Sequence, residues 1–158
     1  AAFIAAALLE LQDAPVDECN LFHGEVGGFG LFNEHGVPLK SYHALRLFRG
    51  LLDHPRRVEA RGAEPGRLAV GAGLAEDGRS AAVLVSGFRP TGEELRLELK
   101  GLPWPGATVY DLQLLDTAHH PVTTGKGAAL EREGSIPLRL RAPAVALVTL
   151  RPAAVGGR

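Results

Sequence analysis

The chain contains one cysteine, Cys19, among 158 residues, and this excludes a framework of internal disulfides. The neighbouring Val16, Leu21 and Phe22 are apolar, which favours a buried, unreactive thiol, because a catalytic thiolate needs a partly exposed site beside a positive group. Apolar runs stay shorter than the ~20 residues needed to cross a bilayer, so no membrane-spanning segment is expected. Residues 1–9 are apolar, but neither a basic segment nor an Ala-x-Ala site accompanies them as in a signal peptide.

An excess of charge of either sign is also missing, because 17 Lys and Arg residues nearly balance 18 Asp and Glu residues. The positive residues are mostly scattered arginines, which indicates solvated strand faces rather than a phosphate-binding patch. We therefore expect neither nucleic acid nor a membrane surface as a partner. The sequence also lacks a Gly-x-Ser-x-Gly nucleophile motif and a phosphate loop ending in Gly-Lys-Ser/Thr, and no cofactor is expected. The compartment stays undetermined.

Apolar residues at helical spacing predict two helices in the first third of the chain. Residues 1–11 are rich in alanine and leucine, and Pro15 follows the end of this pattern. A second helix begins near Pro38 and ends before Pro55. We expect the apolar face of this helix to be buried. That face comprises Tyr42, Leu45, Phe48 and Leu52, and is widened by Leu47 and Leu51.

Between the two helices lies a short and mostly apolar stretch, residues 16–22, which suits a buried strand. A single strand has no partner with which to form a sheet, and it is not stable alone. The chain also opens on Ala1 and Ala2 without a capping residue. We therefore expect this chain to be part of a longer protein whose other strands precede it.

Beyond Pro55 the apolar pattern changes to a period of two, as in residues 95–100, where leucine alternates with charged side chains. Short strand candidates follow one another with turn residues between them, and this predicts an antiparallel sandwich or barrel of strands. The strand candidates are residues 57–60, 68–72, 81–88, 95–100, 108–115, 128–131, 137–141 and 144–150.

The most informative segment is a glycine cluster, residues 27–31, that runs into a proline-led helix start. It resembles the end of the barrel in family 39 of the clan A glycoside hydrolases. In that family the last strand runs into a Gly-Gly-Phe-Gly-Leu-like segment, then Gly-x-Pro-Lys-Pro-x-Tyr, and then a helix ending in a short leucine run. The counterparts in this chain are residues 27–31, Gly36, Pro38, Tyr42 and the pair Leu51 and Leu52. The chain departs from the family pattern at two places. Leu39 and Lys40 stand where the family has the Lys-Pro pair, and Leu21 and Phe22 stand where its last strand usually has a Tyr-Trp pair.

The resemblance implies a mixed α and β fold, in which the last βα unit of a (β/α)8 barrel is followed by an antiparallel β-sandwich. Residues 1–55 would hold a helix, the eighth strand and the eighth helix, residues 56–152 the sandwich, and residues 153–158 a tail. The family's activity is retaining hydrolysis of O-glycosidic bonds, with two carboxyl groups ~5–5.5 Å apart. In the clan these belong to the fourth and seventh strands.

Both catalytic carboxyl groups would therefore precede this chain, and no residue in it is expected to be catalytic. The chain alone is expected to be inactive, as part of a β-xylosidase-like parent enzyme that binds a carbohydrate. Residues just after the eighth barrel strand face the substrate cleft in such enzymes. The resemblance places Phe22 there to stack on a sugar ring, with His23 and Glu25 to bond hydroxyls. Alternatively, Phe22 is a core residue and the other two are solvated.

Other chemistry-bearing residues have simpler interpretations. Adjacent histidines on an extended segment point opposite ways, so His119 and His120 indicate a solvated turn rather than a metal site. Trp104 lies between two prolines and is expected to plug a seam between packed units. Phe29 and Phe32 are interpreted as packing anchors. Four glutamates near strand edges are expected to form surface ion pairs, namely Glu93, Glu94, Glu131 and Glu133.

A second hypothesis is a stand-alone carbohydrate-binding or structural β-sandwich module. In that case Trp104 or residues 23–25 would contact the sugar. Binding titration against oligosaccharides, with and without Trp104→Ala, would separate this hypothesis from the first.

Overall fold

The computed structural model describes residues 1–28, 30–130 and 134–153. Two helices come first and antiparallel strands follow, which confirms the predicted mixture of α and β structure. Within the described residues the elements are α1 (Ala2–Leu11), α2 (Lys40–Leu52), β1 (Arg56–Val58), β2 (Leu68–Leu74), β3 (Ala81–Gly87), β4 (Glu94–Leu99), β5 (Thr108–Leu115), β6 (Val122–Leu130), β7 (Gly134–Arg139) and β8 (Ala144–Pro152). Neither helix is long and apolar enough to cross a membrane.

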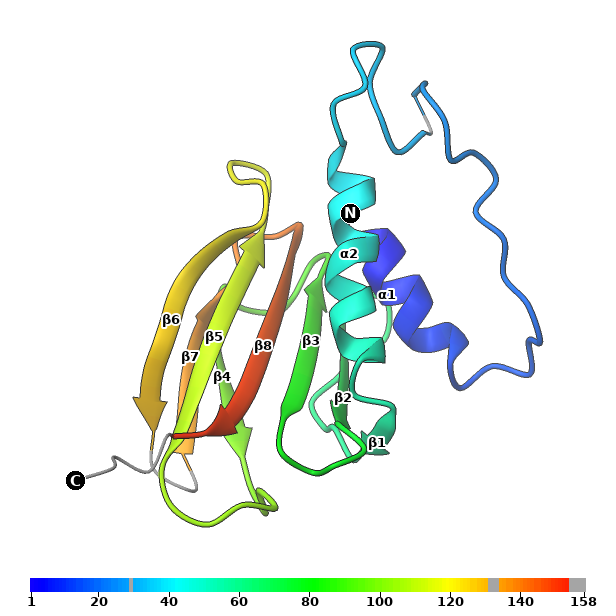
Figure 1. Cartoon of the computed structure of the whole chain (residues 1–158). Helices are drawn as coiled ribbons and strands as arrows, with labels where there is room; N and C mark the ends of the chain where they lie inside the picture. Colours follow the sequence, from blue (N-terminus) through cyan, green and yellow to red (C-terminus); the bar gives the residue numbers. More distant parts are fainter. Residues whose placement is uncertain (29, 131–133, 154–158) are drawn as a thin grey trace.

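The middle layer is a six-stranded antiparallel sheet with the strand order β1-β2-β3-β8-β5-β6. Both helices lie on one face of this sheet, and a two-stranded sheet of β4 and β7 lies on the other (Figure 1). The central strand β3 is buried along its whole length, as its continuous apolar sequence requires. The fold therefore has three layers, in the order helices, large sheet, small sheet.

Side chains on the two faces of the large sheet belong to two separate apolar cores. Leu84 of β3 points to the core beneath the helices, whereas Val83 and Val85 point to the core between the two sheets. Small residues let the helices approach closely. A Cβ added at Gly71 of β2 would lie 2.5 Å from the end of the Leu9 side chain, so a larger residue there would force Leu9 to move.

The predicted apolar face of α2 is only partly buried in this chain. Ala44, Leu47 and Leu51 are buried against the large sheet, whereas Leu52 is 49% exposed, and Tyr42, Leu45 and Phe48 are half-buried. The reason is the small residue Gly50 beside this stripe, where an added Cβ would lie 2.7 Å from the Leu147 side chain. The helix thus meets the sheet through Ala44, Leu47 and Leu51, while Phe48 packs against the edge of the same core and Leu52 stays exposed.

Residues 16–22 do not form the expected strand in this structure. Val16 and Leu21 are about half exposed, and Cys19 is exposed rather than buried. The segment belongs to a long connection between α1 and α2 that runs away from the rest of the protein (Figure 1). Its backbone has no neighbouring strand among the described residues with which to pair, and an isolated strand is not stable.

The strands after α2 follow the predicted order. β4 alternates between exposed and half-buried residues, as its leucine pattern indicates. The turn between β2 and β3 has the expected chemistry, because Asp77 Oδ1 accepts the N–H of Arg79 at 2.9 Å and Gly78 adopts a φ of 67°. The largest difference is β6, which begins at Val122 rather than at residue 128. The tail, residues 154–158, lies outside the described part.

Candidate functional site

The loop that carries the predicted rim residues is attached to the start of α2 by a ladder of hydrogen bonds. Leu31 N–H donates to Glu25 O at 3.1 Å, and Leu39 N–H donates to Leu31 O at 2.8 Å. The hydroxyl of Ser41, in the first turn of α2, donates to Gly30 O at 3.0 Å. These bonds hold the glycine cluster and the residues just before it in a fixed relation to the helix.

Gly30 makes this arrangement possible. A Cβ added at Gly30 would lie 1.9 Å from Glu25 O, closer than any side chain tolerates. Gly27 has a φ of 146°, which side chains rarely adopt, and its carbonyl accepts the N–H of Gly30 at 3.0 Å. The glycine cluster is therefore a tightly folded joint between the loop and α2.

Aromatic packing and an asparagine turn complete the joint. The ring of Phe32 lies 5.3 Å from that of Tyr42 on α2, measured between centroids, which supports the interpretation of Phe32 as a packing anchor. Asn33 Oδ1 accepts the backbone N–H groups of His35 and Val37, both at 2.9 Å. Phe29 lies outside the described residues.

The three predicted sugar-binding residues lie close together on this loop. Phe22 is 94% exposed in this chain, so its ring has no core contact among the described residues. Its ring centroid lies 6.2 Å from that of His23, and His23 Nε2 lies 3.1 Å from Val26 O, within hydrogen-bonding distance. Glu25 is exposed, and its carbonyl belongs to the ladder to α2. The structure offers an aromatic face, an imidazole and a carboxylate on one exposed loop.

A polar cluster at the start of α2 was missed by sequence reasoning. The Lys40 ammonium donates to the backbone carbonyls of Asp116 and Thr117, in the turn between β5 and β6. Asp116 accepts hydrogen bonds from the N–H groups of Ala118 and His119 and lies 2.9 Å from the His119 imidazole. Burial would raise the pKa of Asp116, but these hydrogen bonds outweigh it and lower the pKa below its usual value. The cluster ties α2 to the turn.

His120, the second of the two adjacent histidines, faces α2. The His120 and His43 rings lie 5.2 Å apart, edge to face, and His43 Nδ1 is buried without a hydrogen-bond partner in the part of the chain that the structure describes. Burial lowers the pKa of His43, and the positive charges of His120 and Arg46 lower it further. Among the described residues no group of three or more His, Cys, Asp or Glu side chains could hold a metal ion, and structural zinc sites need four ligands.

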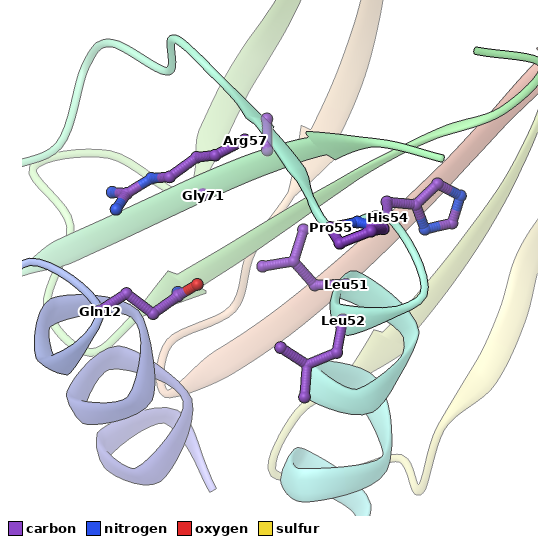
Figure 2. A pocket seen from close by; sticks show the side chains of 8 residues that line it. Gln12, Leu51, Leu52, His54, Pro55, Arg57 and Gly71 are labelled. Atoms are coloured by element: carbon purple, nitrogen blue, oxygen red, sulfur yellow. The ribbon is translucent and has the colours of Figure 1, made fainter. Parts of the chain in front are cut away.

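A cavity of about 180 Å³ lies where the ends of α1 and α2 meet β1 and β2 (Figure 2). Two of its polar side chains, those of Arg57 and His54, already have partners. The two guanidinium nitrogens of Arg57 donate to Asp13 at 2.5 Å each, and the His54 imidazole lies 3.0 Å from both Gly50 O and the Ser80 hydroxyl. The cavity therefore marks the place where the ends of the helices meet the sheet.

Trp104 is buried as predicted, and Glu94 forms a surface ion pair as predicted, whereas no ion pair of Glu93 is found among the described residues. Trp104 is 5% exposed, lies in the core between the two sheets, and donates its indole N–H to the Thr108 hydroxyl at 2.9 Å. It therefore cannot stack on a surface-bound sugar. Glu94 forms an exposed ion pair with Arg139 at 3.3 Å. Glu131 and Glu133 lie outside the described residues.

Comparison with protein-family models and with curated protein sequences finds no match. Solved structures do match. A glucosidase from Croceicoccus marinus superposes with a TM-score of 0.75 at 21% sequence identity over 97% of this chain. A β-xylosidase from Caulobacter crescentus gives a TM-score of 0.56 at 20% identity over 81% of this chain. A GH39 enzyme from Xanthomonas axonopodis pv. citri gives 0.52 at 17% identity over 80%.

The matched part covers 41% of the glucosidase chain, 34% of the xylosidase chain and 33% of the GH39 chain. This chain therefore spans about two fifths or less of the length of the proteins it resembles. The identities are low, so the likeness concerns the fold. At that level the resemblance to glycoside hydrolases indicated by the glycine cluster is confirmed: the chain has the fold of a part of a glycoside hydrolase.

Proposed function

We propose that this chain supplies the closing helix of the barrel and the accessory β-sandwich of a retaining O-glycosidase. The observation that carries the proposal is the match of 97% of this chain to 41% of a glucosidase. Retaining hydrolysis needs a nucleophilic carboxylate and an acid/base carboxyl ~5–5.5 Å apart. In this proposal both carboxyl groups belong to a part of the enzyme outside this chain.

The free side of the helices supports this role. α2 contacts the sheet through Ala44, Leu47 and Leu51, while Leu52 is 49% exposed on another side of the helix. On α1, Phe3 is 73% exposed although the helix is apolar on nearly every side. A helix that is apolar all round is normally buried. We propose that barrel strands cover these sides, and that residues 16–22 become the eighth strand once those strands pair with them.

The loop residues Phe22, His23 and Glu25 would then lie at the rim of the substrate cleft. An exposed aromatic ring beside an imidazole and a carboxylate is suited to stacking on a sugar ring and bonding its hydroxyls. The ladder from Glu25 through Leu31 to Leu39 supports the role, because it fixes the loop to the helix. The sugar would be β-linked, and a xyloside or a glucoside by analogy with the xylosidase and glucosidase.

A first experiment assays the purified chain on aryl β-xylosides and β-glucosides. We expect no hydrolysis above the buffer rate, because the chain holds no catalytic pair. The complete reading frame should in turn encode an Asn-Glu-Pro segment and a second strand-end glutamate ahead of this chain. A reading frame without them would contradict the proposal.

The second candidate, a carbohydrate-binding module, rests on the exposure of Phe22. Calorimetric titration with xylo- and gluco-oligosaccharides separates this candidate from the glycosidase role. It compares the original chain with Phe22→Ala and with the control Phe88→Ala, because the Phe88 ring is also exposed, at 43%. Millimolar or tighter binding by the chain alone, lost only in Phe22→Ala, would favour the module. No binding at millimolar sugar favours a cleft that needs the rest of the barrel.

A further inference from the structure

The turn between β5 and β6 contacts the first turn of α2, at the same end of the molecule (Figure 1). The Lys40 ammonium donates to the carbonyls of Asp116 and Thr117, and the rings of His43 and His120 lie 5.2 Å apart, edge to face. Lys40 and His43 are three residues apart and therefore lie on the same side of the helix. We call this combined contact the latch.

The closed latch favours a neutral His43. Its ring lies edge to face with those of Tyr42, at 5.5 Å, and His120. Its Nδ1 is buried, and no hydrogen-bond partner for it lies in the part of the chain that the structure describes. A protonated imidazole carries an N–H on both nitrogens, so protonation would bury a charged donor without an acceptor, which costs free energy.

Positive charges surround the same histidine. After burial, the charges of His120 and then Arg46 lower the pKa of His43. At the start of α1, the pKa of the Ala1 amino group is lowered by burial and then by the charge of Lys40, so this group adds a further positive charge near the latch. A proton on His43 or His120 therefore enters a region that already repels it.

The acidic residue at the latch, Asp116, is already engaged within the turn. Its carboxylate accepts the N–H groups of Ala118 and His119 and lies 2.9 Å from the His119 imidazole. Protonation of His119 would strengthen this pair inside the turn, and it would add no attraction between the turn and α2. Asp116 consequently offers little compensation for a charge on the two histidines that face each other.

The first turn of α2 also holds the glycine joint. Leu39 N–H donates to Leu31 O at 2.8 Å, and the Ser41 hydroxyl donates to Gly30 O at 3.0 Å. No side chain caps the start of this helix, so its first turn depends on contacts with the rest of the protein. The latch, made by the adjacent Lys40 and by His43, is one of these contacts.

We propose that the latch is sensitive to pH: it is closed while His43 and His120 are neutral and opens when they are protonated, which loosens the first turn of α2 and the glycine joint. His43 binds a proton more weakly in the closed latch than in water, so the open form gains as the pH falls through about 6.5. Only the consequence for a bound sugar rests on the proposed function; the opening itself does not.

The test follows the 158-residue chain by NMR at about pH 7.5 and about pH 5.5. We expect contacts between the ring protons of His43 and His120 at the higher pH and their loss at the lower pH. Amide protection of Leu31 and Leu39, corrected for the intrinsic effect of pH on exchange, should fall at least about threefold, because one histidine with an exposed pKa of about 6.5 allows up to about tenfold. Persisting ring contacts or unchanged protection would overturn the proposal.

A double variant separates the charge from the packing. His43→Phe combined with His120→Phe keeps two rings in contact but removes both titrating groups, so amide protection should stay within about twofold between the two pH values. The control His35→Gln, whose native side chain is 76% exposed, should keep the full fall. Thermal unfolding establishes that the variants fold, and the comparison on the unsubstituted chain stands if one does not. An equal fall in the folded double variant would contradict the latch, whereas a failed glycosidase assay would not.

Discussion

Gly30 decides whether the candidate site keeps its shape. A Cβ on residue 30 would lie 1.9 Å from Glu25 O, so only glycine leaves room for this oxygen. The neighbouring Leu31 N–H donates a hydrogen bond to the same carbonyl. Substitution therefore has to break the ladder that fixes the rim residues to α2. The glycine cluster acts on the site through backbone geometry, and the side chains with binding chemistry come just before it.

Gly30→Ala should release the loop without unfolding the protein. We expect amide exchange at Leu31 and Leu39 to speed up by about tenfold or more, because their hydrogen bonds open locally. The unfolding temperature should change little, since the loop lies outside both cores. Gly24→Ala is the control, because nothing lies within 4 Å of an added Cβ there. Unchanged exchange in Gly30→Ala would contradict the role given to the joint.

His43 should make stability depend on pH. Its pKa is lowered in the folded state by burial, then by His120 and Arg46, so the unfolded state binds more protons as the pH falls. The contribution of neutral His43 is present above the unfolded pKa of about 6.5 and is lost as pH falls below it toward the lower folded pKa. Denaturant unfolding at about pH 7.5 and about pH 5.5 should show a smaller loss in His43→Gln than in the original chain.

The control for this pH effect is His35→Gln. The His35 side chain is 76% exposed and lies next to Glu34, far in sequence from the turn that carries His120. Its substitution should leave the difference between the two pH values unchanged. If His43→Gln and His35→Gln gave the same pH dependence as the original chain, the buried environment of His43 would have no measurable effect on stability.

At the scale of elements, α2 is the piece that connects the parts of the molecule. One of its sides lies on the large sheet through Leu47 and Leu51, its first turn holds the glycine joint through Ser41, and Lys40 binds the turn after β5. Leu52 lies on a side that the sheet does not cover. A second apolar side fits the position proposed for α2, between a sandwich and a barrel.

Two leucine substitutions separate these sides of α2. Leu47→Ala should lower the free energy of unfolding by about 2–5 kcal/mol, because it leaves a cavity beneath the helix. Leu52→Ala should change it by no more than about 0.5 kcal/mol in the isolated chain, because that side chain is half exposed. Equilibrium denaturation of the two variants gives both values. A large loss in Leu52→Ala would mean that this side is already buried in the chain alone.

The sequence predicted the elements best where the pattern was local. The alternating leucines of β4 and the turn at Asp77 and Gly78 fix strands and their connection within a few residues. The sequence indicated Leu47 and Leu51 on the buried side of α2 but not the close approach at Gly50, which depends on Leu147, nearly 100 residues away. Residues 16–22 have a strand-like sequence, but a strand also needs neighbours, and the described residues supply none.

The candidate site was predictable only in part, for the same reason. The glycine cluster marked the joint, and the resemblance indicated Phe22, His23 and Glu25 beside it. The contact of His43 with His120 and the bonds from Lys40 to the turn join segments that a linear pattern cannot relate. The burial of Trp104 was expected from its proline neighbours, and its indole partner Thr108 lies only four residues away.

At the scale of the whole molecule, two features share one property: neither is fully covered or paired among the described residues. These are the exposed apolar residues Phe3 of α1 and Leu52 of α2, and the unpaired residues 16–22. The matched glycosidases extend well beyond the matched part. The barrel of the proposed parent enzyme would cover the first feature and pair with the second.

The measurement that tests this account most directly compares hydrolysis of aryl β-xylosides and β-glucosides by two proteins. One is the 158-residue chain, and the other is the polypeptide encoded by the complete reading frame that contains it. We predict no hydrolysis by the chain alone, and hydrolysis with retained anomeric configuration by the complete polypeptide. Hydrolysis by the chain alone, or a complete polypeptide without glycosidase activity, would contradict the account.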